Sequence, residues 1–135
     1  MARILIVPCG CHGRELASAL RAEGHAVRGT TRGAHVEEIR AAGAEPYVGD
    51  PDRIGTLMDA LYGVTIVVWR TPPGLDTGRV RMLWEKLVDT GVRGVVHEGA
   101  YEELSRESSA TWQIPLEIAE GTDAARVAVN RLLGL

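Results

Sequence analysis

The stretch Arg3-Ile4-Leu5-Ile6-Val7-Pro8-Cys9-Gly10-Cys11-His12-Gly13-Arg14-Glu15-Leu16 decides the fold of this chain. Its apolar run, residues 4–7, has no polar alternation, which is typical of a strand buried on both faces. A short turn containing glycine follows, and Leu16, Ala17 and Leu20 then recur at helical spacing. A strand, a glycine turn and a helix in this order can hold a nucleotide pyrophosphate on main-chain N–H groups and a helix N-terminus.

The turn follows the pattern G-x-G-x-x-G, with Pro8 in place of the first glycine. Gly10 lets the main chain approach a pyrophosphate, and Gly13 lets the helix pack close to the strand. Pro8 fixes its own φ and removes one N–H donor. We therefore predict that residues Gly10, Cys11, His12 and Gly13 contact a dinucleotide. The alternative is a turn that is retained for packing alone.

The rest of the chain alternates between apolar runs and amphipathic segments, most of which end at glycine. Further strands are expected at 26–30, 44–48, 64–69, 92–97 and 114–118. Helices are expected at 34–42, 54–61, 80–88 and 101–106, with a last one capped by Thr122 or Asp123, and 108–111 is expected to be a mobile link. The alternation predicts a three-layer, doubly wound (Rossmann-like) α/β fold: a mostly parallel sheet of about six strands with helices on both faces. Residues 1–135 are expected to form a single domain.

Composition narrows the class of protein. The apolar content of 45% and the charged content of 24% are those of an ordinary globular protein. The net charge of −3 provides no basic field for nucleic acid or an anionic membrane, so neither is expected as a partner. No secretory signal and no run of about 20 apolar residues is visible. Cys9 and Cys11 are too close for a comfortable disulfide, which favours a reducing, cytoplasmic setting.

The end of the second expected strand indicates which dinucleotide is preferred. An NAD-binding domain places Asp or Glu there for the ribose hydroxyls, but this chain has no acidic residue between that strand and Glu37. Thr31 and Arg32 instead suit a 2′-phosphate, because both side chains donate hydrogen bonds to its oxygens. Arg28 and Arg14 would add to the same patch. NADP(H) is therefore the predicted cofactor, with NAD as the alternative, unless these are ordinary exposed arginines.

Residues 4–16 and 24–32 together resemble the start of the atypical and extended short-chain dehydrogenase/reductases, especially NmrA-like and sugar-nucleotide epimerase-like members. The resemblance continues through 48–52, 63–68 and 89–92, so it covers roughly the first hundred residues. It implies contacts to the cofactor from Asp50 and Pro51, with Asp50 at the adenine ring, and from Arg32 at the 2′-phosphate. It also implies that Trp69, Arg70 and Thr71 flank the ribose and nicotinamide.

The chain departs from that family where catalysis is concerned. Active members carry a Tyr-x-x-x-Lys pair, in which the lysine lowers the pKa of the tyrosine so that it acts as an acid–base group. Here Tyr101 is followed by Glu102-Glu103-Leu104-Ser105, and Lys86 is the single lysine. The family's C-terminal substrate-binding segment is also missing. Reductase catalysis of the usual type is therefore not expected.

Three residues near the end of the fifth expected strand are the remaining catalytic candidates: His97, Glu98 and Tyr101. Ligands bind at the carboxyl ends of strands in such sheets, although a solvated loop is the alternative. Cys9-x-Cys11-His12 resembles part of a metal site, but a structural zinc needs four ligands, so no metal is expected.

These observations lead to three functional hypotheses. The first is a dinucleotide-binding domain with a redox-sensing or regulatory role, acting as a homodimer or with a partner protein. The second is an NAD(P)-dependent oxidoreductase with an unconventional active site. The third is a structural or protein-interaction module that binds no nucleotide, with Trp84 and Trp112 on a dimer or partner surface if they are exposed.

Overall fold

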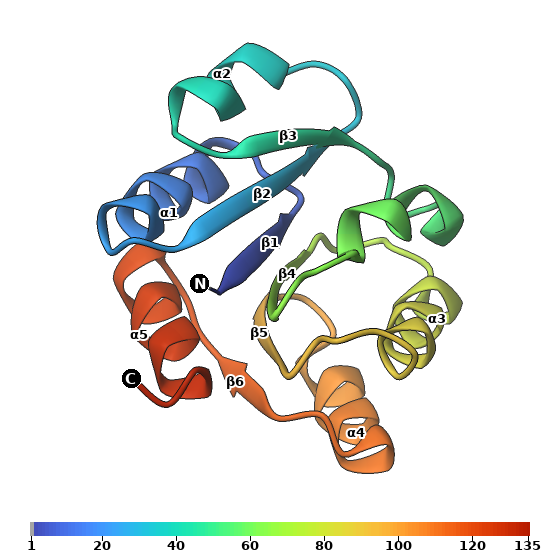
Figure 1. Ribbon diagram of the computed structural model, residues 1–135. Coiled ribbons are helices and arrows are strands. Elements are labelled where there is room, and N and C mark those ends of the chain that lie inside the picture. Colours follow the sequence, from blue (N-terminus) through green and yellow to red (C-terminus); the bar gives the residue numbers. More distant parts are fainter. Residues whose placement is uncertain (1) are drawn as a thin grey trace.

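Six parallel strands lie side by side in the order β3-β2-β1-β4-β5-β6 in the computed structural model, which describes residues 2–135 (Figure 1). The strands are β1 (Arg3–Val7), β2 (Ala26–Thr31), β3 (Glu45–Val48), β4 (Ile66–Thr71), β5 (Gly94–Gly99) and β6 (Leu116–Ile118). The α-helices are α1 (Cys11–Ala22), α2 (Val36–Ala41), α3 (Thr77–Leu87), α4 (Glu102–Trp112) and α5 (Thr122–Leu132). Two 3₁₀ turns, η1 (Ile54–Leu57) and η2 (Asp59–Leu61), lie between β3 and β4.

Each face of the sheet has its own apolar core, because successive residues of a strand point to opposite faces. In β1, Ile4 and Ile6 belong to the core under α1, α2 and α5, whereas Leu5 and Val7 belong to the core under η1, η2, α3 and α4. Helices therefore cover both faces (Figure 1), and the predicted three-layer, doubly wound fold is confirmed.

The strand order fixes where a ligand would bind. From β1 the chain moves outward to β2 and β3, and then returns across β1 to β4, β5 and β6. The connections on either side of β1 therefore leave in opposite directions, which opens a crevice at the carboxyl ends of β1 and β4. Residues 8–10 and 72–74 follow these two strands.

The helix expected at 54–61 is absent, and the two turns η1 and η2 take its place. Local side-chain bonds explain the difference. The Thr56 hydroxyl donates to the Arg53 carbonyl at 2.7 Å and accepts from the Asp50 N–H at 2.8 Å. Such bonds compete with the helical ladder, and Gly55 weakens it further.

The expected mobile link at 108–111 was also wrong, because α4 continues through it to Trp112. Ser108 is buried, and the Ser109 hydroxyl donates to the Ile114 carbonyl at 2.6 Å, so tertiary contacts stabilise the last turn. The last helix is capped by Gly121 with no side-chain hydrogen bond, rather than by Thr122 or Asp123. Pro115 lies just outside β6, which is an edge strand.

No helix within residues 2–135 combines the length and the apolar character that crossing a bilayer would require.

Candidate functional site

The turn after β1 is held tightly against the neighbouring strand β2. The Cys9 N–H donates to the Thr30 carbonyl at 2.8 Å, and the buried Cys9 side chain lies over Gly29, where an added Cβ would be 2.7 Å from Cys9 Sγ. Burial raises the pKa of the Cys9 thiol to about 11, so the thiol stays neutral. On the other side, a Cβ at Gly13 would come within 3.1 Å of Ile6 Cγ2. The glycine spacing therefore lets α1 pack closely on β1.

Two hollows open beside this turn at the carboxyl edge of the sheet. The first, here called the β2-side hollow, has a volume of about 290 Å³, and Thr30, Thr31, Arg32 and Pro51 are among the residues that line it. The second, the β5-side hollow, has a volume of about 250 Å³ and includes Arg70, Thr71, Glu98 and Glu120. Pro8 and Pro72 line both hollows, so the two are neighbours that share a wall.

Thr30 is the polar group of the β2-side hollow that lacks a partner. Its side chain is buried, and its hydroxyl makes no hydrogen bond within the structure. The next hydroxyl along β2 is engaged, because Thr31 Oγ1 accepts from the Gly33 N–H at 3.1 Å. An unsatisfied buried hydroxyl costs about 1–3 kcal/mol. Thr30 therefore gives the hollow a polar group that a ligand can satisfy.

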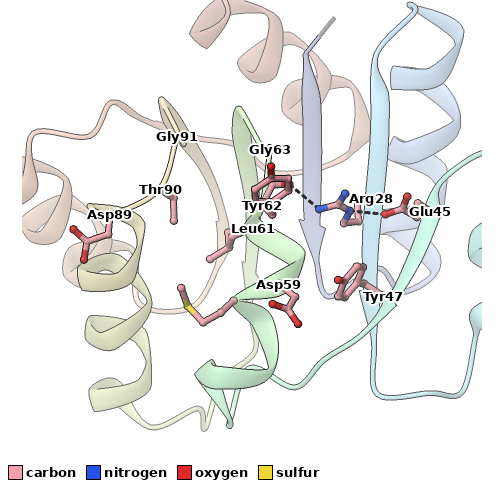
Figure 2. A pocket seen from close by; sticks show the side chains of 11 residues that line it. Arg28, Glu45, Tyr47, Asp59, Leu61, Tyr62, Gly63, Asp89, Thr90 and Gly91 are labelled. Atoms are coloured by element: carbon pink, nitrogen blue, oxygen red, sulfur yellow. Dashed lines mark hydrogen bonds and ion pairs between the residues drawn. The ribbon is translucent and has the colours of Figure 1, made fainter.

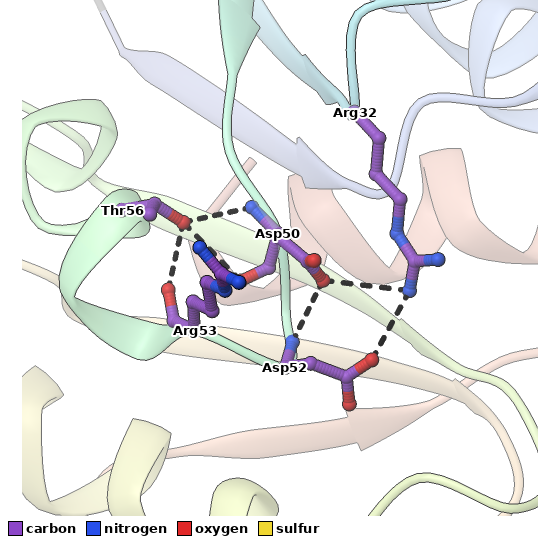
Figure 3. Close-up of polar contacts among 5 residues, drawn as sticks. All are labelled: Arg32, Asp50, Asp52, Arg53 and Thr56. Atoms are coloured by element: carbon purple, nitrogen blue, oxygen red, sulfur yellow. Dashed lines mark hydrogen bonds and ion pairs between the residues drawn. The ribbon is translucent and has the colours of Figure 1, made fainter.

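Arg32 stands at the mouth of the β2-side hollow and is held there by two acidic residues (Figure 3). Its Nη2 lies 3.4 Å from Asp50 Oδ1 and 3.4 Å from Asp52 Oδ2. The same Asp50 oxygen accepts from the Asp52 N–H at 2.9 Å. The Arg32 side chain is 66% exposed, so these ion pairs are weak and an incoming anion can compete for the guanidinium. Gly49 and Pro51 line the β2-side hollow on either side of Asp50.

The β5-side hollow contains an arginine and two carboxylates. Arg70 Nε lies 3.4 Å from Glu98 Oε2, and Glu120 Oε1 accepts from the Gly99 N–H at 3.4 Å. Burial raises the pKa of the Glu98 carboxyl, and the nearby Glu120 adds to that effect while Arg70 opposes it. Glu98 is the one catalytic candidate of the three that borders either carboxyl-edge hollow.

His97 has a structural role. Its side chain is fully buried, with Nδ1 2.8 Å from Ser105 Oγ and Nε2 3.3 Å from both Thr71 Oγ1 and the Gly99 carbonyl. These partners suit a neutral ring with its proton on Nε2. Desolvation lowers the pKa of His97, which keeps the ring uncharged. The His97 ring ties β5 to β4 and α4 inside the core, and His97 lines neither carboxyl-edge hollow.

Tyr101 also makes a structural contact. It adopts a left-handed conformation, φ 68°, immediately before α4, and its hydroxyl accepts from the Gly74 N–H at 3.2 Å. The contact holds the loop after β4 against the start of α4. Tyr101 is not among the residues that line the β5-side hollow.

Other expected site residues lie in different places. Trp69 is fully buried in the core under α3, because strand alternation turns it to the opposite face from Arg70, and it lines neither carboxyl-edge hollow. Cys11 and His12 are exposed on the first turn of α1, and His12 Nδ1 lies 3.7 Å from Glu15 Oε2.

Within residues 2–135, no three His, Cys, Asp or Glu side chains are grouped as a metal site would require. Trp84 is buried, whereas Trp112 is 40% exposed.

Arg28 does not join the arginines at the carboxyl edge. It borders a larger hollow, of about 690 Å³, at the opposite, amino edge of the sheet (Figure 2). Arg28 Nε donates to Glu45 Oε1 at 2.7 Å, and Nη1 donates to the carbonyls of Ala60 and Tyr62 at 2.7 and 3.0 Å. The guanidinium carbon also lies 5.3 Å from the centre of the Tyr47 ring. We call this space the amino-edge hollow.

The fold is shared with solved structures of nucleotide-binding proteins. Citrobacter sp. triphenylmethane reductase complexed with NADP(H) matches with a TM-score of 0.68 and 15% identity, over 87% of this chain and 48% of the reductase. The Bacillus cereus UDP-N-acetylglucosamine 4-epimerase matches with a TM-score of 0.70 and 12% identity, over 89% of this chain and 53% of the epimerase. A short-chain dehydrogenase/reductase superfamily protein from Agrobacterium tumefaciens with bound NAD matches with a TM-score of 0.58 and 24% identity, over 73% and 32%.

These matches confirm, at the level of the fold, the resemblance to short-chain reductases and epimerases that the sequence indicated. The chain spans about half the length of the first two proteins and a third of the last. No protein-family model matches the sequence, and no curated protein shows significant similarity to it.

Proposed function

We propose that this chain binds a dinucleotide, with a preference for NADP(H), across the two hollows at the carboxyl edge of its sheet. The observation that carries the proposal is the unsatisfied hydroxyl of Thr30, which is buried within the β2-side hollow at the point where the strand order reverses. Ligands of doubly wound sheets bind at this reversal. A ligand hydroxyl or ring nitrogen would satisfy the Thr30 side chain.

The two hollows support an order for the parts of the ligand. The adenosine end fits the β2-side hollow, whose walls include Pro51 and the Thr31 and Arg32 segment. The nicotinamide end fits the β5-side hollow, beside Arg70, Thr71 and Glu98. The diphosphate then passes over the Gly10–Gly13 turn. The reductase matched above holds NADP(H) on the same fold.

The preference for NADP(H) rests on Arg32. A 2′-phosphate would replace the weak contacts of this guanidinium with Asp50 and Asp52 by a stronger charge-assisted bond. NAD remains the alternative cofactor, because the Asp50 and Asp52 carboxylates are acceptors that ribose hydroxyls could use. The first experiment is to titrate the protein with NADPH and NADH by calorimetry.

We expect NADPH to bind more tightly than NADH, and Arg32→Ala to weaken NADPH binding about tenfold while changing NADH binding little. Arg53→Ala is the matched control, because Arg53 lies on the loop after β3 that carries Asp50 and Asp52, and no ion pair between its side chain and either carboxylate is among the described contacts. If neither nucleotide bound at millimolar concentration, the proposed function would fall. Tighter binding of NADH would remove the role of Arg32.

We place the role of the bound dinucleotide in redox sensing or regulation in the cytoplasm, with a second copy of the chain or a partner protein. Support comes from the lack of a Tyr-x-x-x-Lys pair and from the structural roles of His97 and Tyr101. In this proposal Glu98 lies beside the nicotinamide. A change between the oxidised and the reduced ring would then change the protonation state of the Glu98 carboxyl.

A further inference from the structure

Asp52 contacts Arg32 from outside the β2-side hollow. Arg32 and Pro51 line that hollow, whereas Asp52 does not. The Asp52 side chain is 55% exposed, and its Oδ2 accepts a hydrogen bond from Arg32 Nη2 at 3.4 Å. Asp52 therefore acts on a ligand in the hollow through the Arg32 guanidinium rather than by lining the hollow itself.

Asp50 contacts the same nitrogen of Arg32 but has a second partner (Figure 3). Its Oδ1 also accepts from the Asp52 N–H at 2.9 Å. The Asp50 carboxylate therefore keeps a main-chain donor when Arg32 turns to a ligand. The Asp52 carboxylate, in contrast, has Arg32 as its single partner among residues 2–135. The contributions of the two acidic residues can consequently be separated by substitution.

The nitrogen that the two carboxylates share is the one that a phosphate needs most. No contact of Arg32 with another side chain within residues 2–135 uses Nε or Nη1; both carboxylates are on Nη2. A guanidinium binds a phosphate best through two parallel N–H groups. The two forks that it can present are Nε with Nη2 and Nη1 with Nη2, so both include the shared nitrogen. A phosphate that binds Arg32 through a fork must therefore displace a carboxylate or lie beside it.

We propose that Asp52 is a specificity-determining residue of the dinucleotide site, which occupies Arg32 in the free protein and thereby reduces the preference for a 2′-phosphate. The proposal rests on the proposed function for the identity of the ligand. NADPH has to compete with the Asp52 carboxylate for Arg32, whereas NADH carries a neutral 2′-hydroxyl and does not. Asp52 is a positioning residue in this proposal, because it acts through Arg32.

Asp52→Asn tests the proposal, because the amide keeps the shape of the side chain and removes its charge. We expect calorimetry to show NADPH binding about two- to fivefold more tightly to Asp52→Asn than to the wild type, with NADH binding unchanged. The same gain is expected for 2′-AMP, which carries the 2′-phosphate without the diphosphate and the nicotinamide. The gain should shrink in about 0.5 M sodium chloride, because salt screens exposed charges.

Three variants serve as controls. Asp59→Asn removes the same charge beside the amino-edge hollow and should bind every probe as the wild type does. Asp52→Glu keeps the charge and should keep the wild-type ratio of NADPH to NADH affinity. In an Arg32→Ala background, Asp52→Asn should no longer tighten NADPH binding, since the residue through which it acts is gone. A structural role of Asp52 would not produce this dependence on Arg32.

The proposal is overturned if Asp52→Asn leaves the binding of NADPH and 2′-AMP unchanged or weakens it. It is also overturned if NADH gains as much affinity as NADPH, or if the gain persists in the Arg32→Ala background.

The failure of the proposed function would look different. If 2′-AMP bound and responded to Asp52→Asn while neither NADPH nor NADH bound, the role of Asp52 would stand and the dinucleotide would be removed. If 2′-AMP did not bind either at millimolar concentration, both proposals would fall.

Discussion

The arginines at the two edges of the sheet differ in whether their N–H groups have hydrogen-bond partners. At the amino edge, Arg28 makes three hydrogen bonds, to Glu45 and to two carbonyls, although the hollow beside it is the larger. At the carboxyl edge the hollows are smaller, yet Thr30 and Arg70, which line them, and Arg14 on α1 all have buried polar atoms that make no hydrogen bond. The larger hollow is therefore bordered by an arginine whose hydrogen bonds are satisfied, whereas the smaller hollows have unsatisfied polar groups beside them, which is where we expect a ligand to bind.

The comparison has a thermodynamic meaning. Satisfied groups at the amino edge stabilise the free protein, whereas unsatisfied groups at the carboxyl edge cost free energy until a ligand contacts them. Substitutions at the two edges should consequently change stability with opposite signs.

The largest effect is expected for Arg28. Arg28→Ala removes the donor to the buried Ala60 and Tyr62 carbonyls, so the free energy of unfolding should fall by about 2–4 kcal/mol in urea denaturation. Arg14→Ala in the same assay should leave the stability of the free protein unchanged or slightly higher. Glu45→Gln should cost less than Arg28→Ala, since Glu45 is 57% exposed. Equal losses for Arg28→Ala and Arg14→Ala would contradict the contrast between the edges.

A smaller and reversed effect is expected at Thr30. Thr30→Val removes a hydroxyl that has no partner, so the free protein should gain about 1 kcal/mol of stability. NADPH binding should weaken about five- to tenfold, because the ligand loses a hydrogen bond. Thr71→Val is the control, since the Thr71 hydroxyl donates to the Ala100 carbonyl at 2.7 Å and its loss should destabilise. A less stable Thr30→Val variant would show that the hydroxyl is satisfied in solution.

The smallest effect is expected from His97, and it is confined to acid pH. Folding lowers the pKa of His97 below its ordinary value of 6.5, so the unfolded chain binds a proton more readily than the native protein does. The contribution of His97 to stability is therefore complete above pH 6.5 and falls as the pH falls through that value toward its native pKa. Denaturation of the wild type and His97→Gln at pH 7.5 and 5.5 should show the larger pH dependence in the wild type.

Glu98 acts in the opposite sense, because folding raises its pKa above 4.5 and its contribution to stability is lost as the pH rises through its native value. The Glu98 effect is present in both proteins, so the difference between them isolates His97. A wild type and variant with parallel pH profiles would mean that the ring can be protonated without loss of its bonds to Ser105 and Thr71.

Much of the fold could be predicted from the sequence because its determinants are local. Unbroken apolar runs such as Ile4–Val7 mark strands buried on both faces, and their alternation with amphipathic segments specifies a doubly wound sheet. The helix prediction for 54–61 was wrong. The apolar residues of this segment have helical spacing, but the Thr56 hydroxyl forms hydrogen bonds with Arg53 and Asp50 that favour turns. Ser108 and Ser109 led to the opposite error. They were expected to lie in a mobile link, but long-range packing holds them in α4.

The site was harder to predict, because its most informative features are polar groups that lack hydrogen-bond partners. The sequence places Gly13 and Arg32 at informative positions, but it cannot show that Arg14 and Thr30 lack partners, because that depends on every segment that fails to reach them. Likewise, only the folded chain brings Cys9 onto Gly29. Successive residues of a strand point to opposite faces, so the sequence alone indicated that Trp69 and Arg70 face opposite ways and have different roles.

The short outer strands also limit how copies of the chain can meet. In β3, the Gly49 N–H after the strand donates inward to the Thr31 carbonyl, so alternation turns the Pro46 position outward, where proline has no N–H to offer. At the other edge, β6 is only three residues long. Neither edge therefore provides a ladder on which a foreign strand could grow, which protects the sheet from aggregation. We therefore expect association of this chain, where it occurs, to be made through its helices and loops.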